Sequence, residues 1–135
     1  MKFASILPVA ALLVFAGCSR APSPAEIDAA DYGQYPTNYQ EVVKSYMGER
    51  LKDPYSAQYD FFKGPTRLWT GGGLSSKKYG YGVCARINAK NSFGGYTGSK
   101  LYFFLINNGL VIRSYGEEEG IVGEAGAEKM CNGAW

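Results

Sequence analysis

The stretch Leu101-Tyr102-Phe103-Phe104-Leu105-Ile106-Asn107-Asn108-Gly109-Leu110-Val111-Ile112-Arg113-Ser114-Tyr115 decides the fold. Its first six residues are apolar or aromatic on both faces of an extended chain, which predicts an interior strand over 101–106. The Asn108-Gly109 pair suits the two positive-φ positions of a type I′ turn. Residues 110–115 then return as the partner strand. The stretch therefore predicts an antiparallel hairpin.

Two more strands are expected before this hairpin. Apolar and polar side chains alternate over residues 81–89. One face of that strand carries Tyr81, Val83, Ala85, Ile87 and Ala89, and the other carries Gly82, Cys84, Arg86 and Asn88. Residues 57–62 predict another strand, and the segment between the two contains three adjacent glycines at 71–73. We expect that segment, including residues 75–78, to be a mobile loop.

An amphipathic helix is predicted over residues 39–52, with Thr37 or Asn38 as its N-cap. Its apolar residues form a single stripe at helical spacing: Val42, Val43, Tyr46, Met47 and Leu51. Packing on a sheet is the expected use of this stripe, and partner binding is the alternative. Asp53-Pro54 should end the helix, because proline lacks a backbone N–H. The predicted fold is α+β, with one N-terminal helix packed on an antiparallel sheet of about four strands.

The start of the chain carries a different pattern. Lys2 precedes an apolar run over 6–15, and small residues then lead to a cysteine in Phe15-Ala16-Gly17-Cys18. This segment resembles the lipobox of bacterial lipoproteins, although Phe15 stands where leucine is usual. The resemblance implies cleavage before Cys18 and attachment of acyl chains such as palmitate to it. A secretory signal and an uncleaved anchor are the alternatives, but about ten apolar residues are short for a bilayer core of about 30 Å.

The same resemblance indicates location and domain organisation. Ser19, rather than aspartate, follows the cysteine, which implies the outer membrane, with the folded part in the periplasm. Residues 1–17 are interpreted as a signal peptide, and 18–36 as the lipidated N-terminus and a flexible tether rich in Pro, Ala and Ser. Residues 37–135 form the single globular domain. With 14 basic and 12 acidic residues, the chain has no charge excess of the kind that nucleic-acid binding needs.

Two cysteines remain once Cys18 is lipidated. Disulfides persist outside the cytoplasm, so Cys84 and Cys131 are predicted to be joined, and two free thiols are the alternative. Because Cys84 is on the polar face of its strand, the bond would hold the C-terminal segment 124–135 across that face. A metal site is not expected, because the chain has no histidine and two thiolates leave zinc short of ligands.

The absence of histidine also removes the Ser-His and Cys-His arrangements of nucleophilic catalysis. Ser75 and Lys78 match the Ser-x-x-Lys spacing of penicillin-recognising enzymes, but they occur in a predicted loop without companion motifs. Residues Glu117-Glu118-Glu119 could bind a cation, although such a run is usually solvated. We predict no catalytic residues and no cofactor.

The remaining feature is the segment Asn88-Ala89-Lys90-Asn91-Ser92-Phe93-Gly94-Gly95-Tyr96-Thr97-Gly98. With Cys84 upstream, it resembles a stretch in small bacterial envelope proteins to which no activity is assigned, and the likeness spans residues 51–106. One interpretation is a stiff connection in which Asn side chains bond to their own backbone. The other is a polar, aromatic-edged binding patch made of Arg86, Asn88, Lys90, Asn91, Phe93 and Tyr96.

Together these features predict a non-enzymatic, lipid-anchored envelope protein that acts as an accessory or protein-interaction module. Its expected partners are the membrane, through the acyl chains, and an envelope protein. The first alternative is an inhibitor of cell-wall hydrolases such as lysozyme, which would insert an exposed loop into an enzyme cleft. The weaker alternative is a cell-wall enzyme that uses Ser75 and Lys78.

Overall fold

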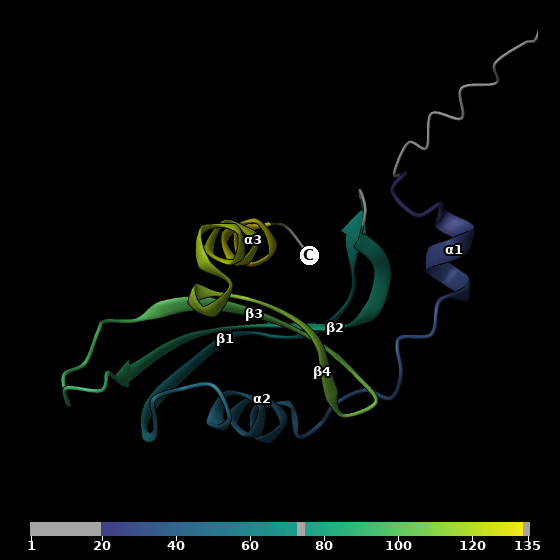
Figure 1. Ribbon diagram of the computed structural model, residues 1–135. Coiled ribbons are helices and arrows are strands. Elements are labelled where there is room, and N and C mark those ends of the chain that lie inside the picture. The colour runs from purple at the N-terminus through teal and green to yellow at the C-terminus, as the bar shows by residue number, and fades with distance from the viewer. Residues whose placement is uncertain (1–19, 73–74, 134–135) are drawn as a thin grey trace, which may run out of the picture.

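A computed structural model describes residues 20–72 and 75–133. It contains one antiparallel sheet in the strand order β1-β2-β3-β4, with helices on both sides (Figure 1). This confirms the α+β class and the four-stranded sheet. The predicted signal peptide and Cys18 lie outside the described residues. The elements are α1 (Pro24–Ala29), α2 (Tyr39–Gly48), β1 (Asp53–Gly72), β2 (Ser75–Lys90), β3 (Lys100–Asn107), β4 (Leu110–Tyr115), the 3-10 helix η1 (Glu117–Glu119) and α3 (Gly120–Asn132).

The hairpin of β3 and β4 was predicted correctly. Asn107 pairs with Leu110 across the turn. Asn108 and Gly109 have φ values of 48° and 75°, which are the positive values that a type I′ turn requires. The apolar run in β3 is buried from Tyr102 to Ile106. Both faces of this strand are therefore covered, and it forms the centre of the protein.

The two faces of the sheet hold separate cores. On one face α2 buries Val43 and Met47 against the sheet residues Val83, Ala85, Ile87, Tyr102, Phe104 and Ile106. This helix lies within the predicted range of 39–52 but ends at Gly48. It ends early because glycine has a low helix propensity. On the other face α3 packs over Phe103 and Leu105. Figure 1 shows α2 and α3 on opposite sides of the sheet.

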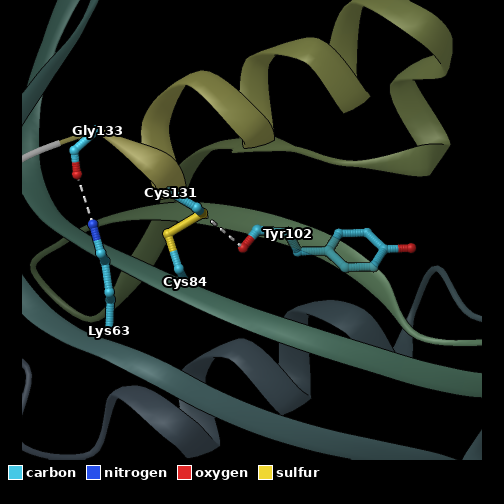
Figure 2. Close-up of a disulfide and its surroundings, with 5 residues drawn as sticks. All are labelled: Lys63, Cys84, Tyr102, Cys131 and Gly133. Atoms are coloured by element: carbon cyan, nitrogen blue, oxygen red, sulfur yellow. Dashed lines mark hydrogen bonds between the residues drawn. A yellow bond between two sulfur atoms is a disulfide. The ribbon is translucent and has the colours of Figure 1, made fainter.

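The prediction of a single helix was wrong, because the C-terminal segment forms α3. Its small residues Gly123 and Ala127 are buried, which lets the helix axis approach the sheet closely. Cys131 in α3 is bonded to Cys84 in β2, so the predicted disulfide is confirmed (Figure 2). Cys84 is fully buried, however, and the strand face expected to be polar is therefore a second core.

The predicted loop before residue 81 is in fact a two-stranded extension of β1 and β2. Trp69 pairs with Tyr79 and Thr70 pairs with Lys78, whereas the β2–β3 pairing begins only at Tyr81. We call residues 66–72 and 75–80 the hairpin arm. Side chains on a two-stranded ribbon need outside partners to be buried. The sequence signal was misleading because the glycines that suggested a loop also suit a close backbone approach, as at Gly71, where a Cβ would meet the Ser76 carbonyl oxygen.

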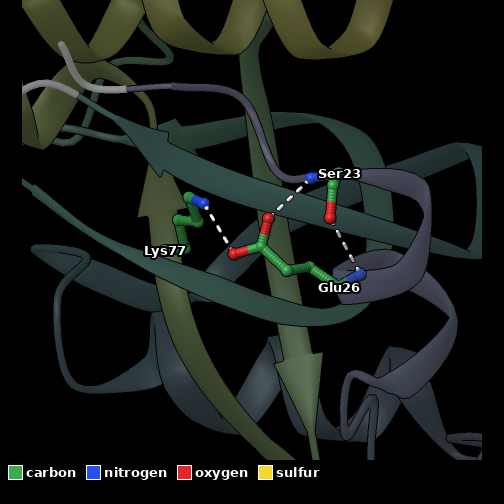
Figure 3. Close-up of polar contacts among 3 residues, drawn as sticks. All are labelled: Ser23, Glu26 and Lys77. Carbon is green, nitrogen blue, oxygen red and sulfur yellow. Dashed lines mark hydrogen bonds and ion pairs between the residues drawn. The ribbon is translucent and has the colours of Figure 1, made fainter.

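Residues 20–36, which we call the strap, were predicted to be part of a flexible tether, but they lie against the hairpin arm. Ser23 and Glu26 form a reciprocal capping box at α1, and Glu26 also pairs with Lys77 of β2 at 3.2 Å (Figure 3). Pro22 and Tyr32 are buried. Tyr32 packs on Tyr79 of the hairpin arm, so the strap covers apolar surface that a two-stranded ribbon cannot bury by itself.

The strap also contacts the β3–β4 turn. Gly33 has a φ of 73°, and a Cβ at this position would lie 2.6 Å from the Asn108 nitrogen. The Asn108 side chain accepts a hydrogen bond from the Gln34 amide, and Asn107 donates one to the Asp31 carbonyl. The Tyr32 ring packs edge-on to Tyr79 at 5.8 Å, and Tyr35 packs on Tyr81 at 5.3 Å.

Candidate functional site

The connection between β2 and β3 carries most of the residues that the sequence singled out. We call residues 91–99 the end loop; it lies at the opposite end of the molecule from α1 (Figure 1). The side-chain oxygen of Asn91 accepts hydrogen bonds from the amides of Phe93 and Gly95 at 2.9 and 3.2 Å. Asn88 accepts a bond from the Gly98 amide at 3.2 Å. Both asparagines therefore bond to the backbone around them, as an Asx-type connection does.

Tyr96 and Lys90 close the base of this loop. The two residues form an isolated antiparallel bridge, and the Lys90 ammonium lies 5.4 Å from the centre of the Tyr96 ring. The Tyr96 hydroxyl donates to the Ser56 carbonyl at 3.2 Å, and the Ser56 hydroxyl accepts a bond from the Lys90 amide. Tyr96 thus ties the loop to the start of β1, while 47% of the residue stays exposed.

Phe93 and Arg86 differ from the other four residues. Phe93 is 96% exposed at the tip of the end loop. Arg86 points to the β1 neighbour, where it pairs with Asp60 at 3.5 Å and lies 4.2 Å from the centre of the Phe62 ring. The candidate patch therefore divides into a group in and beside the loop and a separate surface pair at Arg86.

A cleft of about 320 Å³ opens beside the base of the loop. Its lining combines apolar side chains from the sheet with charged side chains from four different segments. Lys90 and Asn91 belong to this lining, so the cleft and the end loop form one continuous surface. The lining residues are Arg50, Leu51, Lys52, Ile87, Ala89, Lys90, Asn91, Thr97, Lys100, Tyr102, Glu117 and Glu118.

The acidic residues of η1 already have partners within the fold. Glu117 pairs with Lys100 at 3.4 Å. Glu118 accepts a hydrogen bond from the Tyr102 hydroxyl at 3.1 Å, and Glu119 accepts one from Ser114 at 2.8 Å. Within the described residues, no group of three His, Cys, Asp or Glu side chains is placed to hold a metal ion. The three carboxylates act here as internal acceptors.

Tyr102 forms the floor of the cleft on the side of η1. It is 3% exposed, and Gly116 makes room for its ring, since a Cβ at Gly116 would overlap the aromatic carbons. Burial of the phenol raises the pKa of Tyr102 far above its ordinary value of 10, and the neighbouring Glu118 carboxylate raises it further. Tyr102 therefore remains a neutral hydrogen-bond donor at physiological pH.

Basic side chains dominate the rim of the cleft. Arg50 lies 3.5 Å above the Tyr46 ring and donates to the Tyr46 carbonyl at 2.7 Å, which fixes its guanidinium. Lys100 is paired with Glu117. Within the part of the chain that the structure describes, neither Lys52 nor Lys90 forms an ion pair with a carboxylate. Two uncompensated ammonium groups thus remain at the cleft.

The structure places the Ser-x-x-Lys pair in an unfavourable geometry for catalysis. Ser75 and Lys78 both lie in β2, where successive side chains alternate between faces. Residues three apart in a strand point to opposite faces, so the serine and lysine do not converge as they would on one helix turn. Ser75 pairs with Gly72 at the end of the hairpin arm.

Sequence reasoning found the loop half of this surface but missed the cleft. Arg50, Lys52, Lys100 and the η1 glutamates come from segments far apart in the chain, and no local pattern links them.

Comparison with protein-family models, curated proteins and solved structures found no match. Among the described residues, no helix is long and apolar enough to span a membrane.

Proposed function

We propose that the protein is a non-enzymatic, lipid-anchored accessory or protein-interaction module of the bacterial envelope, which captures its partner with the end loop and the adjoining cleft. The observation that carries this proposal is the exposure of Phe93 on a loop whose shape is fixed by Asn91. A large aromatic side chain held at a rigid tip is the type of anchor that dominates protein interfaces. It has no packing role in the fold.

The lipid anchor on Cys18 and the outer-membrane location belong to the same proposal, and the lipobox supports them. The docked strap adds a geometric consequence. Only five Cα–Cα steps separate Cys18 from Ser23, the N-cap of α1, so an extended link spans at most about 18 Å. The hairpin arm would then stay near the lipid surface, while the end loop at the opposite end of the domain would point away from it.

A quantitative pull-down tests this function. The full lipidated protein is crosslinked in intact envelopes and isolated in detergent, with Cys18→Ala as the mislocalised control. We expect one protein to be enriched with the lipidated form and lost from Phe93→Ser. Equal enrichment from all three proteins, or none from any, would contradict an anchored interaction module.

A second candidate function is inhibition of a cell-wall hydrolase such as lysozyme. The protruding Phe93 favours it, because a stiff loop with an exposed tip can enter an enzyme cleft. Cell-wall lysis by lysozyme is measured with an excess of the protein and of its Phe93→Ser variant. Inhibition by the first protein alone supports this function, and unchanged lysis with both removes it.

A further inference from the structure

The cleft beside the end loop has an electrostatic imbalance that its own residues do not remove. Four basic side chains line it against two carboxylates, Glu117 and Glu118. Lys100 pairs with the first of these carboxylates, and the Tyr102 hydroxyl donates to the second. Concave sites with low-dielectric walls concentrate the field of such charges. A negatively charged ligand group is therefore favoured there.

The two lysines without a carboxylate partner among the described residues, Lys52 and Lys90, line the same cleft as several apolar side chains. Lys52 follows α2, and Lys90 ends β2. The apolar part of the lining includes Ile87, which is 2% exposed, together with Leu51 and Ala89. A ligand that satisfies this arrangement carries at least two negative groups and an apolar group in the same short segment.

Backbone donors decide which negative group fits. Phosphate sites in proteins are typically built from backbone N–H groups at a helix N-terminus or in a nest. In the end loop, six backbone amides already donate within the loop and its base: those of Asn91, Phe93, Gly94, Gly95, Thr97 and Gly98. Recognition is left to lysine and arginine side chains, which suit carboxylates as well as phosphates. These six amides are therefore not available to form a phosphate cradle.

Aromatic side chains beside the cleft indicate a peptide ligand. Tyr96 is 47% exposed above Lys90, and Phe93 stands at the loop tip. Exposed aromatic side chains are typical anchors of protein-recognition surfaces. We infer that the cleft binds an acidic peptide segment of the partner, with its carboxylates at Lys52 and Lys90 and an apolar side chain against the apolar part of the lining. This inference rests on the proposed function and names the chemistry of its partner.

Fluorescence anisotropy of the full-length lipidated protein in detergent tests the inference. The probe is the fluorescein-labelled peptide Glu-Leu-Glu-Asp-Phe-Glu, and Gln-Leu-Gln-Asn-Phe-Gln is its neutral counterpart. We expect saturable binding of the acidic probe only. Removing both lysine charges in Lys52→Gln/Lys90→Gln should weaken that binding by about 3- to 30-fold, because exposed ion pairs contribute up to about 1 kcal/mol each.

A matched double variant controls for total charge. Lys44→Gln/Lys129→Gln removes the same charge from exposed positions outside the cleft, and its affinity should equal that of the unmodified protein. An equal loss of affinity in both double variants would overturn the site, as would undetectable binding of the acidic probe. Thermal melting checks that each variant is folded.

Competition identifies the ligand group and separates the inference from the proposed function. If inorganic phosphate displaces the acidic probe at concentrations where acetate does not, a phosphate ligand replaces the acidic peptide and the inference is wrong. If Lys52→Gln/Lys90→Gln captures the envelope partner as well as the unmodified protein does, the cleft is not the contact. That second result would contradict the cleft inference but leave the proposed interaction module intact. If no variant and no unmodified protein captured a specific partner, the proposed function itself would be contradicted.

Discussion

The two ends of β2 show how differently one strand can be used. At the hairpin arm, the strap covers the ribbon with Tyr32 and pairs Glu26 with Lys77. At the other end, residues 91–99 of the end loop are all exposed. Phe93 is 96% exposed, and Lys90 contacts the Tyr96 ring but forms no ion pair with a carboxylate among the described residues. The strap is rich in Ala and Pro, and the end loop is rich in Gly and Ser. Composition therefore indicates irregular backbone but does not determine whether the fold packs that backbone or leaves it exposed.

The largest loss of stability is expected on removing the disulfide of Cys84, which lies in β2 between its two ends. Replacing both cysteines, in Cys84→Ala/Cys131→Ala, opens a loop with a sequence separation of 47 residues. The chain-entropy relation gives a loss of about 4 kcal/mol in the free energy of unfolding. Urea denaturation followed by circular dichroism measures it. A loss below about 1 kcal/mol would mean that α3 holds the second core without the bond.

The next largest loss of stability is expected at Tyr32 in the strap. Tyr32→Ala removes a ring that is 8% exposed, whereas Phe93→Ala removes one that is 96% exposed. We expect the first to cost about 2 kcal/mol of stability and to raise hydrogen exchange in the strap. The second should change stability by less than about 0.5 kcal/mol. Equal costs would show that the end loop is packed like the strap.

Asn91 tests whether the end loop is held by its own hydrogen bonds. Asn91→Ala leaves the Phe93 and Gly95 amides without their acceptor, and we expect a loss of about 1 kcal/mol with faster exchange of both amides. Asn91→Asp keeps an acceptor at the same position and should preserve the slow exchange. Slow exchange in the alanine variant would contradict this account of the loop.

The smallest effect concerns the pH dependence of the strap. The Ser23 backbone N–H, followed by Lys77, lowers the pKa of Glu26 from 4.5 to about 2. A depressed carboxyl pKa contributes stability above the ordinary pKa and loses it as the pH falls through the folded value. Docking of the strap should therefore weaken between about pH 4.5 and pH 2, as hydrogen exchange in residues 20–36 can measure.

Glu26→Gln serves as the control for this titration. The variant should lack the pH dependence in that window, because its side chain carries no ionisable carboxyl. If the two proteins showed the same acid loss of strap protection, another group would be responsible.

Strong local patterns made the sheet predictable. The run in β3, which is apolar on both faces, and the Asn108-Gly109 turn each have one favourable structure. The disulfide was predicted from the number of cysteines and from the expected location outside the cytoplasm. The hairpin arm was not predictable in the same way. Gly71 and Gly72 favour a loop when they are considered alone, and the segment becomes a strand only because β1 pairs with β2. Long-range pairing decided the structure of that segment.

The strap and α3 escaped prediction for a related reason. Tyr32 and Pro22 look like isolated residues in a tether, and only the arm beside them provides the surface that buries them. In α3, Gly120, Gly123 and Gly126 weaken the helical signal, although Gly126 is what lets the helix approach Tyr115. The cleft was hidden because its charged residues come together only in three dimensions.

Site-specific photo-crosslinking tests the central claim, that partners bind at the uncovered end of β2. The same photoreactive amino acid is placed in the full-length lipidated protein either at Phe93 or at Tyr35, which is 56% exposed on the strap. After irradiation of intact cells, the account predicts a discrete protein adduct from position 93 and none from position 35. An adduct from position 35 with none from position 93 would contradict it.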